Sequence, residues 1–128
     1  MRIDHIGYAV KDINKAKKSM EALGYIFEPT VEDNERSIFI AFGELDGCRI
    51  ELVAPMNEGS PVDMYLSKIG PTPYHICYIS SDIEADIEKL KADRFKVSVP
   101  PAAAIAFGSK RVAFLYSLSA GLIEIVED

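Results

Sequence analysis

Several features are absent from this sequence of 128 residues, and each absence excludes a class of protein. No apolar run approaches the roughly 20 residues that a membrane-spanning helix needs. The N-terminal residues Met1 to His5 lack a signal-peptide pattern, because an acid and a histidine interrupt them and no long apolar region follows. We therefore expect a cytoplasmic protein with no membrane partner.

The sequence has fewer basic than acidic residues, and it has few cysteines. The formal net charge is −6, which disfavours a nucleic-acid partner. The two cysteines, Cys48 and Cys77, lie inside apolar strand patterns and form no CxxC pair. This placement predicts two small buried side chains rather than a disulfide or a metal site. The hydrophobic fraction of 48% supports a globular core.

What the sequence does contain is an internal repeat. Residues 4–8 (DHIGY) are echoed by residues 74–78 (YHICY), and the only two histidines, His5 and His75, stand 70 residues apart. Each copy ends in a short apolar strand with one acid inside it, Glu51 in the first and Glu124 in the second, 73 residues apart. A period this long lies outside the usual solenoid range and indicates one duplicated module with pseudo-two-fold symmetry.

Both copies have the same order of expected elements, a strand, a helix and three further strands. Asp12 is the expected N-cap of the first helix, and Ser81 with Glu84 predicts a capping box for the second, at about residues 82–93. Residues 29–36 and 100–104 are expected as loops. The expected strands are residues 2–10, 25–28, 37–42, 48–53, 74–79, 95–99, 111–116 and 122–126.

Strand alternation predicts a metal site. The residues that follow His5 and His75 at alternating positions, and those that flank Glu51 and Glu124, are apolar and must pack against the helices. The two histidines and the two glutamates should therefore share the uncovered face. A lone strand histidine is usually structural and a lone strand glutamate is often an edge charge, but repetition in register favours a common role. Two imidazoles and two carboxylates suit one divalent ion, such as Zn, Ni, Co, Mn or Fe(II).

These residues and strings resemble the vicinal oxygen chelate superfamily, which includes glyoxalase I, methylmalonyl-CoA epimerase, extradiol dioxygenases and antibiotic resistance proteins. The resemblance covers nearly the whole chain and is strongest to the methylmalonyl-CoA epimerases. It implies an α+β fold in which two tandem βαβββ modules form one cupped, mostly antiparallel sheet of eight strands with helices on the outer face. The modules would span about residues 1–55 and 72–128, joined by a helical linker at about 56–71. The strings that support the resemblance are residues 4–12, 50–52, 60–62, 75–78, 107–110, 112–115 and 122–124.

The resemblance also implies roles for individual residues. The metal ligands would be His5, Glu51, His75 and Glu124, and Glu124 would in addition act as an acid/base. A second acid/base is expected in the loop at residues 31–36, where Glu32, Asp33 and Glu35 compete. Ser109 and Lys110 are the candidates for substrate binding. Two departures from the epimerases concern the substrate rather than the fold. Tyr74 replaces a histidine, and residues 104–109 replace a Gly-Ala-His-Gly-type segment.

Three functions remain open. The first is proton transfer next to a thioester through a metal-stabilised enolate, as in methylmalonyl-CoA epimerase. The second is a glyoxalase I-type lyase that acts on a methylglyoxal–thiol hemithioacetal, and the third is a binding protein that sequesters a small molecule. The two acidic ligands and the acids of the loop favour an enzyme over a binding protein. The family also implies a homodimer.

Overall fold

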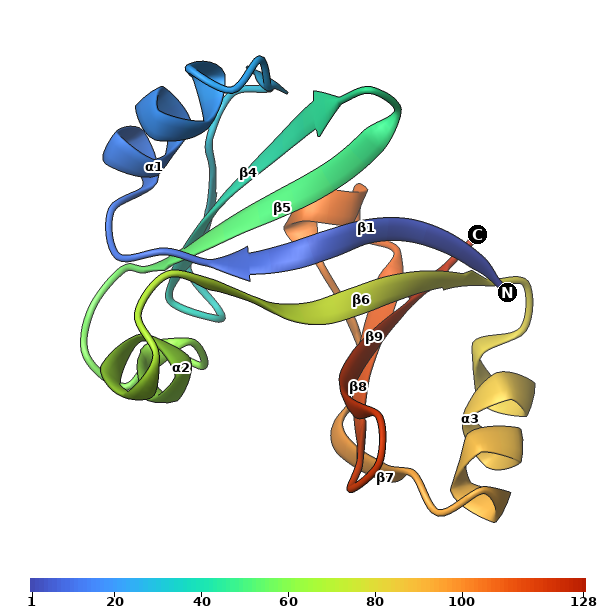
Figure 1. Ribbon diagram of the computed structural model, residues 1–128. Helices are drawn as coiled ribbons and strands as arrows, with labels where there is room; N and C mark the ends of the chain where they lie inside the picture. Colours follow the sequence, from blue (N-terminus) through green and yellow to red (C-terminus); the bar gives the residue numbers. More distant parts are fainter. The chain divides into compact units, whose positions relative to one another are not determined.

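The computed structural model describes all residues from 1 to 128 and contains nine strands and three α-helices (Figure 1). The chain divides into two compact units, one of His5–Tyr74 and the other of Met1–Asp4 with His75–Asp128. The predicted α+β class is confirmed. The strand count is nine rather than eight, because β3 (Val31–Asp33) forms inside the expected loop at residues 29–36. None of the helices combines the length and the apolar character of a membrane span.

The unit His5–Tyr74 is a mixed sheet with a helix on one face. Its strands pair in the order β2-β4-β5-β1, and β3 pairs with β4. The pair β1/β5 is parallel and the other pairs are antiparallel. The elements are β1 (Arg2–Ala9), α1 (Ile13–Glu21), β2 (Ile26–Phe27), β4 (Ile38–Leu45), β5 (Cys48–Pro55) and α2 (Asp63–Lys68).

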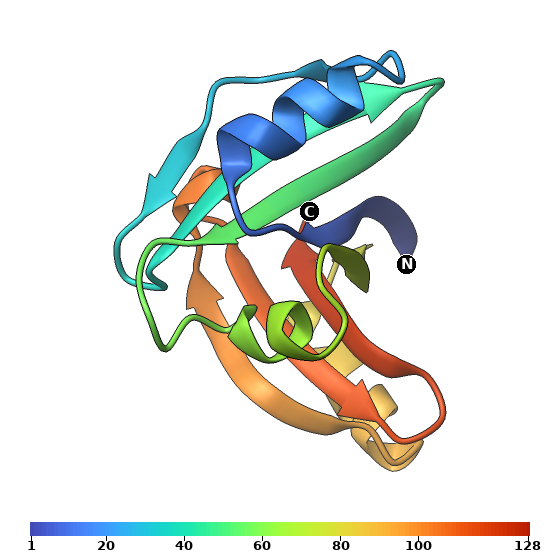
Figure 2. The same ribbon diagram turned by 60° about the vertical axis from the view of Figure 1, so that its left-hand side comes forward.

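Helix α1 begins where the sequence predicts. The Asp12 carboxylate accepts a hydrogen bond from the backbone N–H of Lys15 at 3.0 Å, as an N-cap does. Ile13 then packs with Ile50 and Leu52 in a buried apolar cluster, and α1 lies along this face of β4 and β5 (Figure 2). Each such buried side chain contributes about 1.5–3 kcal/mol. Because side chains alternate along β5, Glu51 is on the face that α1 does not cover.

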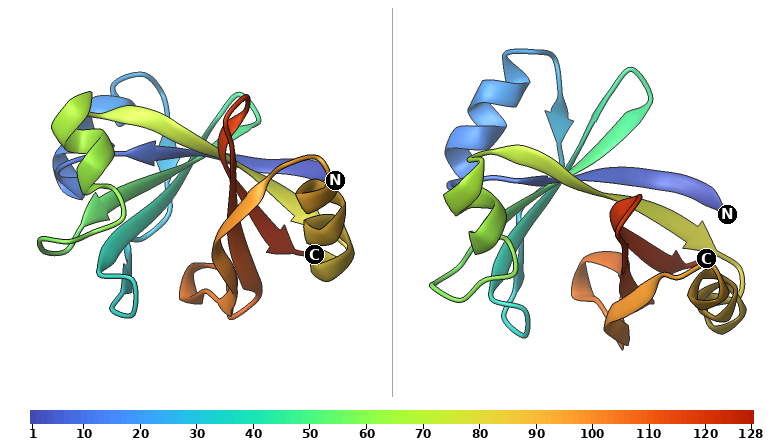
Figure 3. Two further views of the ribbon diagram at one scale, coloured as in Figure 1. Left: turned by 90° about the horizontal axis from the view of Figure 1, so that it is seen from below. Right: turned by 60° about the horizontal axis from the view of Figure 1, so that its bottom comes forward.

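The other unit repeats this plan. Its strands pair in the order β6-β9-β8-β7, with β6/β9 parallel and the rest antiparallel. Ile83 and Ile87 of the helix pack against Leu115 and Ile125 of the sheet. Figure 3 shows the tight turn that joins β8 to β9. The elements are β6 (Thr72–Ser80), α3 (Ile83–Ala92), β7 (Lys96–Ala103), the 3-10 turn η1 (Ile105–Phe107), β8 (Arg111–Ser117) and β9 (Gly121–Glu127).

The N-cap of α3 differs from the predicted capping box. Asp82 has extended backbone geometry, and its carboxylate accepts the N–H of Ala85 at 3.0 Å. Glu84 instead accepts a hydrogen bond from the guanidinium of Arg111. Asp82 stands 70 residues after Asp12, so the duplication itself places the cap there.

The loop expected at residues 100–104 is strand as far as Ala103. β7 is an edge strand that pairs with β8, and its register shifts between Val97 and Val99 and again before Ala102. Proline has no N–H for a ladder, but an edge strand with bulges does not need one at every residue. Pro100 and Pro101 therefore do not end the strand.

The cysteines are both free thiols, as predicted, but only one is buried. Cys77 packs with Val112 and Val126 in an apolar cluster. Cys48 is exposed, so its predicted burial is wrong. It is the first residue of β5 and follows a turn at Asp46 and Gly47, where the strand has not yet entered the core.

Candidate metal centre

The first histidine and the first acid meet through the pairing of two parallel strands. Gly7 of β1 lies opposite Glu51 of β5, and His5 is two residues earlier on the same face as Gly7. The two side chains therefore converge. Nε2 of His5 lies 3.1 Å from Oε2 of Glu51, and the side chains are 0% and 5% exposed. A buried imidazole–carboxylate pair results, on the face opposite α1.

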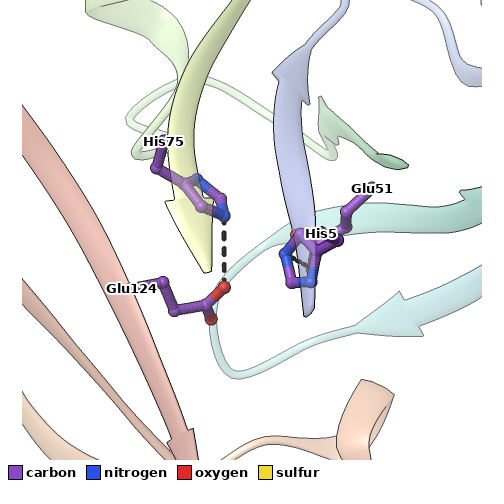
Figure 4. Close-up of side chains that lie close together, drawn as sticks. All are labelled: His5, Glu51, His75 and Glu124. Carbon is purple, nitrogen blue, oxygen red and sulfur yellow. Dashed lines mark ion pairs between the residues drawn. The ribbon is translucent and has the colours of Figure 1, made fainter. Parts of the chain in front are cut away.

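The second pair has the same construction. Cys77 of β6 lies opposite Glu124 of β9, and His75 is again two residues earlier. Nε2 of His75 lies 3.1 Å from Oε2 of Glu124, and the side chains are 0% and 4% exposed. Figure 4 draws both pairs. The duplicated sequence thus produces two pairs with the same strand register, the same atoms in contact and the same burial.

Each pair has a phenylalanine beside it that the sequence reasoning missed. Phe42 lies opposite Glu51 across β4 and β5, and Phe114 lies opposite Glu124 across β8 and β9. Each ring meets the histidine of its own pair edge-on, with ring centroids 5.5 Å apart for His5 and 5.4 Å apart for His75. The two phenylalanines are 72 residues apart, close to the repeat distance, and that spacing was the available signal. Their bulk helps to fix the imidazole rings in place.

The chemistry of the donors fits a divalent metal ion. Oε2 of Glu51 is buried, and it accepts no hydrogen bond even though an imidazole nitrogen lies beside it. A buried carboxylate oxygen without a hydrogen bond is costly unless a cation or a metal compensates it. His5, Glu51, His75 and Glu124 are all buried, and each offers one ligand atom of a type that divalent ions bind.

The two loop acids predicted as catalytic are both exposed. Glu32 of β3 is exposed and pairs with Phe39 of β4, which packs against the cluster on the helix side of the sheet. Glu32 therefore points to the face opposite that of Glu51. Glu35 is exposed in the turn between β3 and β4. The third competitor, Asp33, is buried and holds Arg36, whose backbone N–H and Nη1 both donate to it at 3.0 Å.

Ser109 and Lys110 lie in the turn between η1 and β8. Both side chains are exposed, and the backbone of Ser109 has a positive φ of 69°. The turn is closed by backbone hydrogen bonds from Ser109 N to Ala104 O at 3.0 Å and from Lys110 N to Phe107 O at 3.2 Å. Their role in substrate binding stays a prediction.

Arg111 follows this turn and forms ion pairs with two glutamates of the same unit. Its guanidinium donates to Glu127 of β9 and, at 2.6 Å, to Glu84 of α3. These hydrogen bonds lower the pKa of both Glu84 and Glu127 below the usual range of a glutamate. They also raise the pKa of Arg111. The three groups are partly exposed, so the network joins a helix to the sheet without forming a second buried site.

The sequence matches one family model and is similar to several known proteins. A family model described as the glyoxalase/bleomycin resistance protein/dioxygenase superfamily matches residues 4–114. An uncharacterized protein of Bacillus subtilis, YqjC, is 31% identical over 119 residues, which cover 86% of this chain and 84% of the relative. The ethylmalonyl-CoA/methylmalonyl-CoA epimerase of Cereibacter sphaeroides is 30% identical over 118 residues, with 90% and 87% covered.

The fold of this chain is also similar to that of a solved epimerase structure. It is a variant of the methylmalonyl-CoA epimerase of Streptomyces coelicolor in complex with 2-nitronate-propionyl-CoA. It matches with a TM-score of 0.86 at 26% identity, covering 100% of this chain and 97% of that one. The predicted resemblance to methylmalonyl-CoA epimerases, which are isomerases, is confirmed, and so is the prediction of an enzyme. The binding of a divalent metal and the homodimer stay predictions.

Proposed function

The chain belongs to the glyoxalase/bleomycin resistance protein/dioxygenase superfamily, and from this premise we propose that it moves a proton at the carbon next to a thioester carbonyl. The proposed substrate is a methylmalonyl-CoA-like acyl thioester, and the proposed reaction is epimerisation. The observation that carries the proposal is the buried histidine–glutamate pair that recurs in identical register in both units.

The two pairs together would hold one divalent metal ion. Its protein ligands would be His5, Glu51, His75 and Glu124, all of them buried. Such an ion, when bound, supplies a Lewis acid that stabilises negative charge on a carbonyl oxygen. Phe42 and Phe114 support this role, because each packs edge-on against one of the histidines and restricts its ring. A restricted donor set reduces the ordering needed when an ion binds.

Glu124 is proposed to remove or return the substrate proton. A carboxylate has two oxygens, so Oε2 can remain beside Nε2 of His75, at 3.1 Å, while Oε1 takes the proton. The Glu124 side chain is only 4% exposed and lies opposite Phe114 of β8, so water has little access to this carboxylate. Exclusion of water strengthens the electrostatic interactions on which proton transfer depends.

Epimerisation needs a second acid/base on the other side of the reacting carbon. We assign it to Glu51, because this side chain has the same burial and the same contact with a histidine as Glu124. We prefer Glu51 to Glu32, because Glu32 pairs with Phe39 and its side chain points to the helix side of the sheet. Glu35 is exposed in a turn, where no hydrogen bond or ion pair holds its side chain in place for a proton transfer.

The test is hydrogen exchange in D2O, followed by NMR on metal-loaded protein. We expect methylmalonyl-CoA to gain deuterium at the α-carbon and to lose its stereochemical purity. A glutathione–methylglyoxal hemithioacetal offered in a second tube should remain unchanged. Conversion of the hemithioacetal alone would replace the epimerase with a glyoxalase-type lyase. No reaction in either tube would contradict both enzyme activities and leave the sequestering protein.

A further inference from the structure

The residue before the histidine differs between the two copies. Asp4 precedes His5, whereas Tyr74 precedes His75. The ring of Tyr74 packs against that of Tyr65 on α2, with the ring centroids 5.0 Å apart, so in the second copy this position contacts the linker helix. The duplication therefore gives only the first histidine a carboxylate as its neighbour in the sequence.

The carboxylate of Asp4 lies close to the imidazole of His5. A carboxylate oxygen of Asp4 and a ring nitrogen of His5 are within 4.8 Å of each other, and Asp4 is half-buried. The two residues are joined by a peptide bond inside β1, so this proximity is a property of the strand itself. Arg2, the nearest cation in the sequence, forms its ion pair with Asp128 rather than with Asp4.

The two ring nitrogens of His5 have different surroundings. Nε2 lies 3.1 Å from Oε2 of Glu51, on the side of the ring where a metal ion would bind. Nδ1 is the ring nitrogen nearer to the backbone, and a side chain on the preceding residue can reach this atom. Consecutive residues of a strand direct their side chains to opposite faces, so Asp4 does not extend to the Nε2 side. Asp4 is therefore placed as a partner of Nδ1 and not as a further metal ligand.

We infer that Asp4 is a positioning residue, which accepts a hydrogen bond from Nδ1 of His5 when a divalent ion is bound at Nε2. A histidine that binds a metal through one nitrogen usually donates its other N–H to a carboxylate, a carbonyl or water. Such a hydrogen bond fixes the tautomer and the orientation of the ring and makes the imidazole a stronger ligand. The inference rests on the metal site of the proposed function and adds a residue that does not touch the ion.

The experiment is NMR of isotope-labelled protein, with zinc as the probe. The chain contains only two histidines, so the ring-nitrogen spectrum holds signals of His5 and His75 alone. In the zinc-loaded wild type we expect a downfield Nδ1–H proton of His5 that exchanges slowly with water. Asp4→Asn should move this proton upfield, speed its exchange and raise the Kd for zinc about 10- to 100-fold. Asp4→Glu should keep part of the affinity, because it retains a carboxylate.

The matched control is Asp93→Asn, which makes the same chemical change at an exposed carboxylate at the end of α3. It should leave the signals of His5 unchanged and the Kd for zinc within about twofold of wild type. The signals of His75 report on the fold. Equal changes at His75 and His5 in Asp4→Asn would assign Asp4 to general stability and overturn the inference.

Failure of the inference and failure of the proposed metal site give different results. Zinc binding by the wild type, with His5 signals and a Kd that Asp4→Asn does not change, would overturn the role of Asp4 alone. A wild-type protein that does not bind zinc or another divalent ion would contradict the proposed metal site and overturn the inference with it.

Discussion

At the scale of the residue, the site is two copies of one small arrangement: a histidine, a glutamate on the neighbouring parallel strand, and a phenylalanine across from the glutamate. The sequence pointed to His5, Glu51, His75 and Glu124 because histidine is rare in this chain and because both residue types recur at the repeat distance. The metal role of these four residues is a proposal. Their convergence in two buried pairs is what the structure adds.

Glu124→Gln provides a test at this scale. Glutamine keeps the size of the side chain but cannot take up a proton as a base, and it is a poorer ligand. We expect the rate of α-proton exchange to fall by about 10²–10⁴-fold, the usual contribution of a general base, with metal held more weakly. Exchange is followed by NMR and metal content by elemental analysis.

The matched control for this variant is Glu88→Gln on α3. Glu88 is exposed and forms a surface ion pair with Lys91, so the same chemical change should leave the exchange rate within about twofold of wild type. Exchange at the wild-type rate in Glu124→Gln would remove Glu124 from the mechanism.

The roles of Phe42 and Phe114 could not be derived from residue types alone. Their roles depend on which residue of β4 lies opposite Glu51, and that register depends on where the turn between β4 and β5 begins. The expected strands leave residues 43–47 between them, but β4 continues to Leu45 and the turn is shorter. This difference of three residues, from 42 to 45, changes the cross-strand neighbours of every residue in the pair.

At the scale of the element, the helices and long strands were predictable, because each has a cap or an apolar pattern of clear period. The short strand β3 was not, because Val31–Asp33 is mostly polar and acquires strand geometry only by pairing with β4. The capping box at Ser81 and Glu84 was wrong for a related reason. Asp82 caps the helix instead of Ser81, and Glu84 accepts a hydrogen bond from Arg111.

The ion pairs of Arg111 predict a pH dependence. Hydrogen bonds from Arg111 lower the pKa of Glu84 and Glu127 in the folded protein, while both carboxyl groups keep the ordinary glutamate pKa of about 4.3 in the unfolded chain. These ion pairs therefore stabilise the folded protein at pH values above the ordinary pKa of glutamate. The stabilisation is lost as the pH falls through the lowered pKa values of the folded protein. Arg111→Gln should have a lower Tm than wild type at pH 7.

The Tm difference between the two proteins should shrink as the pH falls from about 5 to 3, because protonation of the two carboxylates weakens their ion pairs with Arg111. Thermal unfolding at a series of pH values measures this convergence. Lys91→Gln, which breaks a surface pair on α3, controls for the general effect of losing one positive charge. A Tm difference for Arg111→Gln that stays constant down to pH 3 would contradict the assignment.

At the scale of the whole molecule, duplication is the property that the sequence displays most clearly. Both copies have a strand, a capped helix and a final run of strands, and both place the histidine two residues before the partner of the glutamate. Membership of the superfamily agrees with this plan. The parallel pairing of the first and last strand of each copy joins residues more than 40 positions apart, and no local pattern predicts such a contact.

The central claim is that the two histidine–glutamate pairs form one metal site. Metal analysis after dialysis against a divalent ion tests it directly, with wild type compared to Glu51→Ala and Glu124→Ala. We expect one ion per chain in wild type and a loss of affinity of about 10- to 100-fold or more in both variants, one from each pair. Two ions per chain in wild type, or full occupancy in either variant, would contradict the claim.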